Sequence, residues 1–168
     1  HEALLVDAQT DDLALEEVRS RLRSFGPDFL IIPSAPSYLF WRCPPPELRV
    51  PMEWFAALGR DATKVLIGPH GSATPRAALR KTGADVVLKG EPDQAIADLA
   101  SRAWQDIDGC CWRDEQGEHL APTLGVVDMK TLKALDFENY NVEKHWHRHH
   151  VFWGEGRGAE LEFARGCP

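Results

Sequence analysis

Three short segments of small and polar residues carry the groups that proteins use to hold a broad, flat ligand. Each follows an apolar run, and the candidate binding residues are Ser34, Ala35, Pro36, Ser37 and Tyr38; Gly68, His70, Gly71 and Thr74; and Gly90, Glu91 and Pro92. Small residues let backbone amides come close to a ligand and donate hydrogen bonds to it. One such segment alone fits a plain turn equally well, but three at one sheet edge favour a binding site.

Cys167 is a second candidate for chemistry. Residues 159–164 (AELEFA) alternate apolar and acidic side chains, which predicts a strand, and this strand runs directly into Arg165-Gly166-Cys167-Pro168. A cysteine at the carboxyl end of a strand is well placed to act as a thiolate ligand of an iron–sulfur cluster. From its position alone, an ordinary turn cysteine remains the alternative.

A histidine-rich segment is the third candidate. His145, His147 and His149 share one face if this segment is extended, and His150 follows them. Imidazole nitrogens bind transition metals, but no cysteine or carboxylate completes a recognised ligand spacing here. The alternative interpretation is an amphipathic connector between two domains.

The elements that must position these residues follow an alternating pattern. Apolar runs predict strands at residues 3–7, 28–33, 64–67 and 85–88. Helices are predicted between and after them: one capped by Asp11 or Asp12 and ended by Gly26, one opened by Pro51, one over residues 76–82 capped by Thr74, and one over residues 93–104. This order is typical of a parallel sheet in an α/β fold with helices on both faces.

Two further features follow the fourth predicted strand. Residues 109–112 and 118–121 flank Asp114-Glu115-Gln116-Gly117, which predicts a β-hairpin. Adjacent Cys110 and Cys111 are expected on opposite faces of the first hairpin strand, where they rarely pair. A core of this size needs no disulfide, so the four cysteines favour a reducing cytoplasm.

Composition limits the function classes. The chain has 168 residues, 43% hydrophobic and 27% charged, which is ordinary for a globular domain. Its formal net charge of −7 argues against a nucleic-acid-binding face. No apolar run approaches the ~20 residues of a membrane span, and no signal peptide is expected at the start. Neither G-x-G-x-x-G nor G-x-x-x-x-G-K-[ST] is present, so dinucleotide and P-loop functions lack their phosphate-binding segments.

Three segments together resemble the cobalamin-binding class of radical-SAM proteins. "GPDFLIIPSAPSY" is similar to that family's F-x-P-D-x-V-x-x-S-x element, and "GEPDQAIADLA" to its G-E-x-E-x-x-x-x-x-L element. "LEFARGCP" resembles the entry to the radical-SAM barrel, where the family continues to C-x-x-x-C-x-x-C. The resemblance covers nearly the whole chain.

The resemblance implies a Rossmann-like or flavodoxin-like domain at residues 1–106, a hairpin and linker at 107–158, and the start of a truncated barrel at 159–168. It implies cobalamin on the first domain, with a 4Fe-4S cluster and S-adenosylmethionine in the full-length protein. Cys167 would be the first cluster cysteine, and Ser34, Ser37, Gly68, His70 and the Gly90-Glu91 pair would approach the corrin.

By the same resemblance the full-length protein is an enzyme, either a methyltransferase or an oxidative cyclase-like enzyme. It would act on a small-molecule substrate and take electrons from a reductant such as flavodoxin or ferredoxin.

The sequence departs from the family pattern in two ways, and a third motif, expected in the missing first loop, does not bear on the comparison. The other two cluster cysteines would lie beyond Pro168, so this chain alone is not expected to hold the cluster. The family's first strand and helix are expected to be missing, which would make the fragment less stable and its cobalamin binding weaker. No D-x-H-x-x-G motif, the source of a lower axial histidine in other cobalamin domains, is present.

Two other functions stay open from the sequence. A flavodoxin-like cofactor-binding or signalling module would need a phosphate-binding serine and threonine loop or an acidic pocket, for which Asp7 is the candidate. A non-catalytic metal-binding protein would use the histidine-rich segment.

Overall fold

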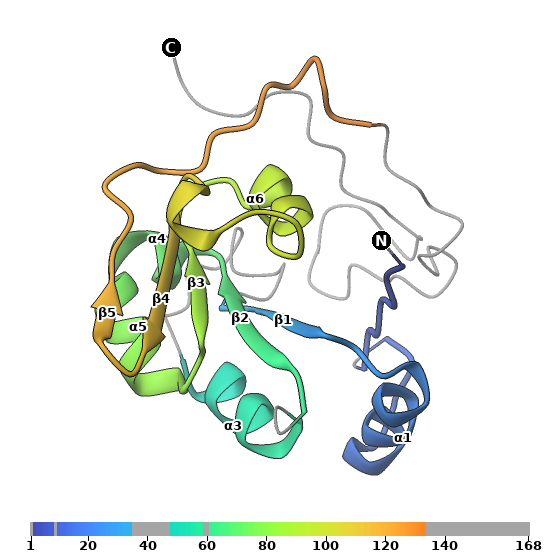
Figure 1. Ribbon diagram of the computed structural model, residues 1–168. Coiled ribbons are helices and arrows are strands. Elements are labelled where there is room, and N and C mark those ends of the chain that lie inside the picture. Colours follow the sequence, from blue (N-terminus) through green and yellow to red (C-terminus); the bar gives the residue numbers. More distant parts are fainter. Residues whose placement is uncertain (1, 9, 35–47, 59–60, 134–168) are drawn as a thin grey trace, which may run out of the picture. The chain divides into compact units, whose positions relative to one another are not determined.

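The computed structural model describes residues 2–8, 10–34, 48–58 and 61–133. The chain divides into two compact units, Pro27–Val127 on the one hand and His1–Gly26 with Asp128–Pro168 on the other. Helix α1 (Leu15–Phe25) belongs to the second unit, whereas the sheet and the other described helices belong to the first (Figure 1). The predicted strand at residues 159–164 and the histidine-rich segment lie outside the described residues.

The sheet has five strands in the order β1-β2-β3-β4-β5 (Figure 1). These are β1 (Phe29–Pro33), β2 (Thr63–Ile67), β3 (Val86–Leu88), β4 (Cys110–Asp114) and β5 (Gly117–His119). The pairs β1–β2 and β2–β3 are parallel, and the pairs β3–β4 and β4–β5 are antiparallel. The predicted α/β class is confirmed. The predicted hairpin extends the same sheet, which makes the sheet mixed rather than purely parallel.

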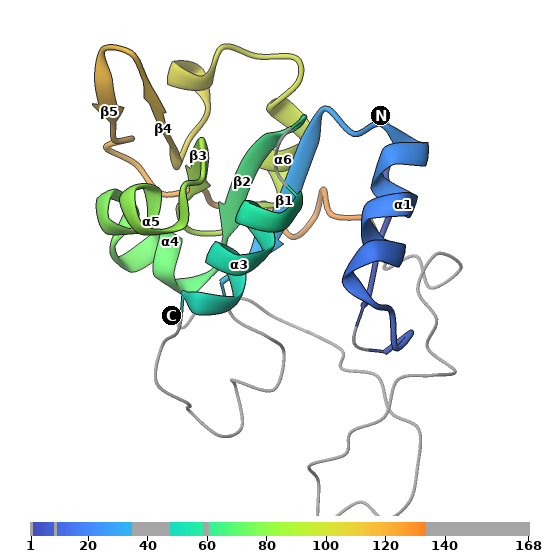
Figure 2. The same ribbon diagram turned by 90° about the horizontal axis from the view of Figure 1, so that it is seen from below.

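Helices cover both faces of the sheet, as predicted (Figure 2). Helices α3 (Arg49–Leu58), α4 (Pro69–Ala73) and α5 (Pro75–Thr82) lie on one face. Helix α6 (Asp93–Asp98) and the short 3₁₀ helix η1 (Trp104–Asp106) lie on the other. Successive strand residues alternate between two buried clusters because side chains alternate across a sheet. Leu66 and Val87 pack under α3 and α5, whereas Val65, Val86 and Leu88 pack under α6.

The adjacent cysteines follow the same alternation. Cys111 belongs to the cluster under α5 and Cys110 to the cluster under α6, and both are fully buried and free. Their predicted placement on opposite faces of β4 is therefore confirmed.

The predicted strand at residues 3–7 is wrong. The structure has no strand over these residues, and Leu4 and Leu5 are 43% and 59% exposed. An apolar run of this length becomes a strand only where a neighbour supplies backbone hydrogen bonds. Sequence periodicity carries no information about such a neighbour.

Helix α1 is confirmed, with a correction at its start. Gly26 ends it in the left-handed conformation at φ 66°, as the glycine predicted. Neither Asp11 nor Asp12 is the N-cap, because that position is Ala14, whose N–H donates to the Glu17 carboxylate at 2.9 Å. Glu17, the third helical residue, therefore satisfies the N–H of the N-cap residue, and no side chain at the N-cap accepts from the helix.

Three helix boundaries also differ from prediction. Helix α3 begins at Arg49, two residues before Pro51, and the short helix α4 forms where a simple turn was expected. Helix α6 ends at Asp98 rather than near residue 104. The Trp104 indole N–H donates to the backbone oxygen of Leu99 at 3.2 Å, so a side chain satisfies a carbonyl that a longer helix would have used.

Candidate functional site at the carboxyl edge of the sheet

The carboxyl ends of the three parallel strands lie along one edge of the sheet. Ser34 follows β1, residues 68–72 follow β2, and residues 89–92 follow β3. We call these residues the rim. Ligands of open α/β sheets bind beyond this edge, because backbone amides and helix starts collect there. The structure therefore brings together the described members of the three predicted segments.

Ser34 joins the first strand to the loop after the second. Only 2% of its surface is exposed, and its backbone N–H donates to the oxygen of Ile67 at 2.8 Å. Its hydroxyl accepts a hydrogen bond from the backbone N–H of His70 at 3.3 Å. Ser34 thus fixes the position of the His70 backbone at the rim.

Ser72 joins the second loop to the third. Its hydroxyl donates to the oxygen of Gly68 at 3.2 Å and accepts from the backbone N–H of Gly90 at 2.9 Å. Ser72 was not among the predicted site residues. The available signal was a serine four residues after Gly68, the spacing at which a helical hydroxyl bonds back to a carbonyl.

His70 lies in the second loop, and its Nε2 atom is buried and has no hydrogen-bond partner among the described residues. Nε2 of His119 belongs to the same class, although the Asp114 carboxylate lies 2.9 Å from it. A buried polar atom without a partner costs about 1–3 kcal/mol, so a bound molecule that reached His70 would remove that cost. The backbone oxygen of His70 accepts from the N–H of Thr74 at 2.9 Å and from its hydroxyl at 3.3 Å.

Those two bonds determine the role of Thr74. It occupies the N-cap position of α5, as predicted, but its side chain makes no cap hydrogen bond there. The hydroxyl is turned back toward His70 instead, while Pro75 fills the first helical position. Thr74 therefore anchors the C-terminal side of His70, as Ser34 anchors its N–H.

Gly71 allows α4 to lie directly on the sheet. A Cβ atom at this position would come within 2.8 Å of Cγ1 of Val87 and within 3.2 Å of the oxygen of Leu88. Contacts this short are forbidden for a side chain, so glycine sets the distance between the second loop and β3. Its part in the rim is to bring the loop close.

Backbone contacts with Gly125 hold the third loop, residues 89–92, in place. Gly125 donates its N–H to the oxygen of Lys89 and accepts from the N–H of Glu91, both at 2.9 Å. A Cβ at Gly125 would lie 2.6 Å from the oxygen of Glu91, and Gly90 and Gly109 meet the same backbone just as closely. Glycine is needed at all three positions because the backbone segments at residues 89–91, 109 and 125 pass close to one another.

The remaining members of the third loop also make internal contacts. The Glu91 carboxylate accepts from the N–H of Val127 at 2.7 Å. Pro92 is half-buried at the N-cap position of α6. Gly90 and Glu91 therefore help to position the loop.

Several predicted site residues cannot be compared with the structure. Ala35, Pro36, Ser37, Tyr38, Cys167 and the histidine-rich segment lie outside the described residues. Within the described ranges, no group of three or more histidine, cysteine, aspartate or glutamate side chains could hold a metal ion. No helix there is long and apolar enough to cross a membrane.

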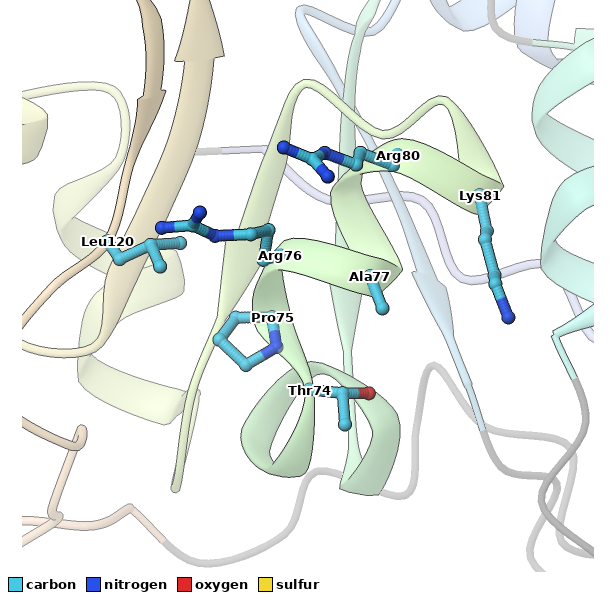
Figure 3. Close-up of a pocket in the computed structure, with 7 residues that line it drawn as sticks. All are labelled: Thr74, Pro75, Arg76, Ala77, Arg80, Lys81 and Leu120. Atoms are coloured by element: carbon cyan, nitrogen blue, oxygen red, sulfur yellow. The ribbon is translucent and has the colours of Figure 1, made fainter.

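A concave surface lies beside α5, away from the rim (Figure 3). This open groove of about 480 Å³ is lined by Thr74, Pro75, Arg76, Ala77, Arg80, Lys81 and Leu120. Arg76 extends toward Leu120 and Lys81 points away from it (Figure 3). Arg76 and Arg80 both pair with Glu118, whose side chain is 13% exposed. The groove is thus partly neutralised by the protein itself.

Perturbed ionisable groups lie elsewhere in the sheet. Burial raises the pKa of Cys110 to about 12 and also raises that of Cys111, so both thiols stay protonated and are poor metal ligands. On the β4–β5 hairpin, Nε2 of His119 lies 2.9 Å from the Asp114 carboxylate, and this contact lowers the pKa of Asp114. The His119 ring also stacks on Trp112, with centroids 4.6 Å apart.

No protein-family model matches the chain, and no curated protein does. One similar solved structure is that of the cobalamin-dependent S-adenosylmethionine radical enzyme OxsB with aqua-cobalamin bound. The TM-score is 0.46 at 15% sequence identity, over 71% of this chain and 17% of that chain. The chain thus spans less than a fifth of that enzyme, and a likeness of this size carries no functional argument.

Proposed function

We propose that this chain is the cobalamin-binding part of a radical-SAM enzyme and that the rim receives the corrinoid. The observation that carries the proposal is the rim itself. Ser34, Gly68 and His70 lie at one sheet edge, tied by the hydrogen bond from the His70 N–H to Ser34, and Nε2 of His70 has no partner among the described residues. The sequence resemblance names the ligand class, and the rim offers groups suited to it.

The described rim residues fit a corrinoid on three grounds. Gly68 carries no side chain, which leaves the edge low enough for a broad ring to approach. Ser34 accepts one hydrogen bond, and its own hydroxyl proton has no acceptor among the described residues. Nε2 of His70 is a nitrogen donor in need of a partner. When bound, cobalamin supplies the cobalt chemistry, and the protein orients and shields it.

The rest of the enzyme follows from the resemblance alone. In this proposal residues 1–106 form the cobalamin domain, 107–158 the hairpin and linker, and 159–168 the start of the barrel. Cys167 is the first of three cysteines on a 4Fe-4S cluster that cleaves S-adenosylmethionine. The complete enzyme transfers a methyl group to a small-molecule substrate and receives electrons from a flavodoxin or ferredoxin in the cytoplasm.

Cobalamin binding is tested by visible spectra and by hydrogen exchange. The chain is titrated with hydroxocobalamin and, in parallel, with flavin mononucleotide, the ligand expected of a flavodoxin-like module. We expect saturable binding of hydroxocobalamin, with slower amide exchange in residues 68–74 and unchanged exchange in residues 113–117 of the hairpin turn. Preferential flavin binding, or protection at the hairpin and not at the rim, would overturn the proposal.

The cluster is tested on protein that extends beyond residue 168. Anaerobic reconstitution of that protein should give iron–sulfur absorbance, and Cys167→Ala should abolish it. Cys43→Ala is the matched control, because the resemblance gives Cys43 no role in the cluster. Equal absorbance in the Cys167→Ala protein would refute the assignment of this cysteine.

A further inference from the structure

We propose that the open edge of β5 and the groove beside α5 together bind an extended, acidic segment of a partner protein, which adds a strand to the sheet. Both parts belong to the compact unit Pro27–Val127. Glu118 joins them, because it lies on β5 and its carboxylate contacts two arginines of α5. The surface lies away from the rim, so the proposal goes beyond the proposed cobalamin site and does not depend on it.

The backbone of β5 is the first argument. β5 is the last strand of the sheet, and no described strand pairs with its outer side (Figure 1). On β4, the N–H of Arg113 donates to the oxygen of Asp85, on the side of β3 and away from β5. Arg113 and its register partner Glu118 therefore form a non-hydrogen-bonded pair. The backbone N–H and C=O of Glu118 consequently point away from β4, where a further strand could bind them.

The charge of the groove is the second argument. Helix α5 carries Arg76, Arg80 and Lys81 and no acidic residue, and all three basic residues line the groove (Figure 3). Among the described residues, the Glu118 carboxylate pairs with Arg76 and Arg80. Three cations against one carboxylate leave an excess of positive charge, although the whole chain has a net charge of −7. Such a surface is complementary to an acidic partner.

The two arginines have N–H groups left for a second carboxylate. A guanidinium group has five N–H donors in one plane. The Glu118 carboxylate lies 3.5 Å from Nε of Arg76, and it accepts from Nε and from a terminal nitrogen of Arg80, the latter at 3.2 Å. The side chains of Arg76 and Arg80 remain 59% and 62% exposed. A carboxylate on an added strand would therefore meet guanidinium groups that Glu118 already orients.

Apolar surface lies on both faces of this edge. Pro75, Ala77 and Leu120 contribute to the groove, and Leu120 is 37% exposed. On the opposite face, the His119 ring stacks on Trp112 with centroids 4.6 Å apart. Side chains of an added strand would alternate between the two faces. We therefore expect an occupant that alternates acidic residues, on the α5 face, with apolar residues on the other.

The segment that follows β5 is fixed, so the groove is formed before binding. The backbone N–H of Ala121 donates to Sγ of Cys111 at 3.3 Å, and its oxygen accepts from Nζ of Lys89 at 2.8 Å. Leu120 directly precedes Ala121 and is thereby held beside α5. A surface that is already in its binding conformation loses less conformational entropy when the partner binds. A small anion would satisfy the arginines alone, whereas an extended acidic segment would also satisfy the backbone of Glu118.

A designed peptide tests the surface by nuclear magnetic resonance. The probe is a capped hexapeptide of alternating valine and glutamate, and its counterpart has lysine in place of glutamate. Titration of the acidic peptide into the ¹⁵N-labelled chain should move the amide signal of Glu118 and the Nε signals of Arg76 and Arg80 until saturation. The lysine peptide should bind at least about tenfold more weakly. Saturable shifts confined to other residues, no saturable shift, or equal binding of both peptides would overturn the proposal.

Variants test whether the arginines of the groove hold the peptide. Arg76→Gln/Arg80→Gln should weaken binding of the acidic peptide about fivefold or more, as expected for the loss of two exposed charge pairs. Arg23→Gln is the matched control, because Arg23 is 66% exposed and also pairs with a glutamate, but lies on α1. It should leave the affinity unchanged. Circular dichroism verifies that each variant is folded, and equal affinities of the two variants would contradict the proposal.

N-methylation of the peptide tests strand addition itself. Successive N–H groups of an extended strand point to opposite sides, so methylating all glutamates or all valines blocks one side only. Antiparallel pairing with β5 would be abolished by methylated glutamates, and parallel pairing by methylated valines. We expect one pattern to abolish binding and the other to retain it. Binding that tolerates both patterns, or that is lost with both, would refute strand addition.

Sedimentation of the chain alone distinguishes a partner protein from a second copy of this chain. We expect a monomer at the concentrations of the titration. A dimer that the Arg76→Gln/Arg80→Gln variant dissociates would show that a second copy occupies the edge, and would overturn the assignment to an acidic partner.

Discussion

Replacement of Gly125 by alanine is the sharpest test of how the rim is supported. The added Cβ would lie 2.6 Å from the oxygen of Glu91 and 3.1 Å from that of Lys89. Both neighbours are backbone atoms, and Gly125 is hydrogen-bonded to the oxygen of Lys89 and to the N–H of Glu91, so neither residue's backbone can move aside as a flexible side chain would. The substitution must therefore push the segment around residue 125 away from the third loop.

The cost can be worked from these contacts. Overpacking a close contact costs about 1–3 kcal/mol, and each of the two backbone hydrogen bonds lost contributes about 1 kcal/mol. Part of the clash is relieved when those bonds break, so the terms are not fully additive. We expect Gly125→Ala to lower the free energy of unfolding by about 2–4 kcal/mol.

Urea unfolding followed by circular dichroism measures this difference. Val126→Ala is the matched control, because Val126 is the next residue and is 77% exposed, so truncating it should change stability by less than about 0.5 kcal/mol. Hydrogen exchange should also show faster exchange at the Glu91 amide in Gly125→Ala. Equal stability of the two variants would refute the view that close backbone packing holds the third loop.

Three further predictions follow from individual contacts. Ser72→Ala leaves a backbone N–H of the third loop without its partner and should destabilise the protein by about 1–3 kcal/mol, whereas Ser101→Ala at an exposed helix end should change little, as measured by urea unfolding. The thiol of Cys110, with a pKa of about 12, should resist iodoacetamide at pH 8 in the native state and react in urea, as mapped by mass spectrometry; native labelling would contradict its burial. The pKa of Asp114 is lowered, so its interaction with His119 is present at pH values above the ordinary pKa of 3.8 and is lost as the pH falls below that value. In His119→Gln, nuclear magnetic resonance titration should show the pKa of Asp114 rising toward 3.8. An unchanged pKa of Asp114 in this variant would contradict the pairing.

Local sequence signals predicted most of the sheet correctly. The runs at residues 28–33, 64–67 and 85–88 became β1, β2 and β3 because three or four consecutive apolar residues suit a strand covered on both faces. The turn residues were sufficient to predict the hairpin. They did not predict its pairing with β3, because that pairing depends on contacts between residues far apart in sequence.

The errors have a common physical origin in competition between neighbouring groups. Ala14 took the N-cap of α1 because the Glu17 carboxylate could reach its N–H, although aspartates precede it. Helix α6 stopped early because the Trp104 indole supplied a donor at its end. Such choices depend on side-chain reach in three dimensions, which spacing alone does not give.

At the rim, too, the sequence predicted the location of the residues but not the role of each one. Serine, glycine and histidine after three apolar runs were sufficient to locate its described part at one edge of the sheet. Their separate roles were not readable, because a glycine in a turn looks the same whether it admits a ligand or another backbone. Gly71 and Gly125 both admit protein backbone, and the partner of Gly125 lies more than 30 residues away along the chain.

These roles divide the rim into a supporting part and a binding part. The third loop spends its polar groups internally, since Gly90 donates to Ser72 and Glu91 accepts from Val127. In the second loop, Nε2 of His70 has no hydrogen-bond partner among the residues that the structure describes. Substitutions in the third loop should therefore change stability first and ligand affinity only through it, whereas substitution of His70 should change affinity directly. If substitutions in the two loops changed affinity and stability to the same extent, this division of the rim would be refuted.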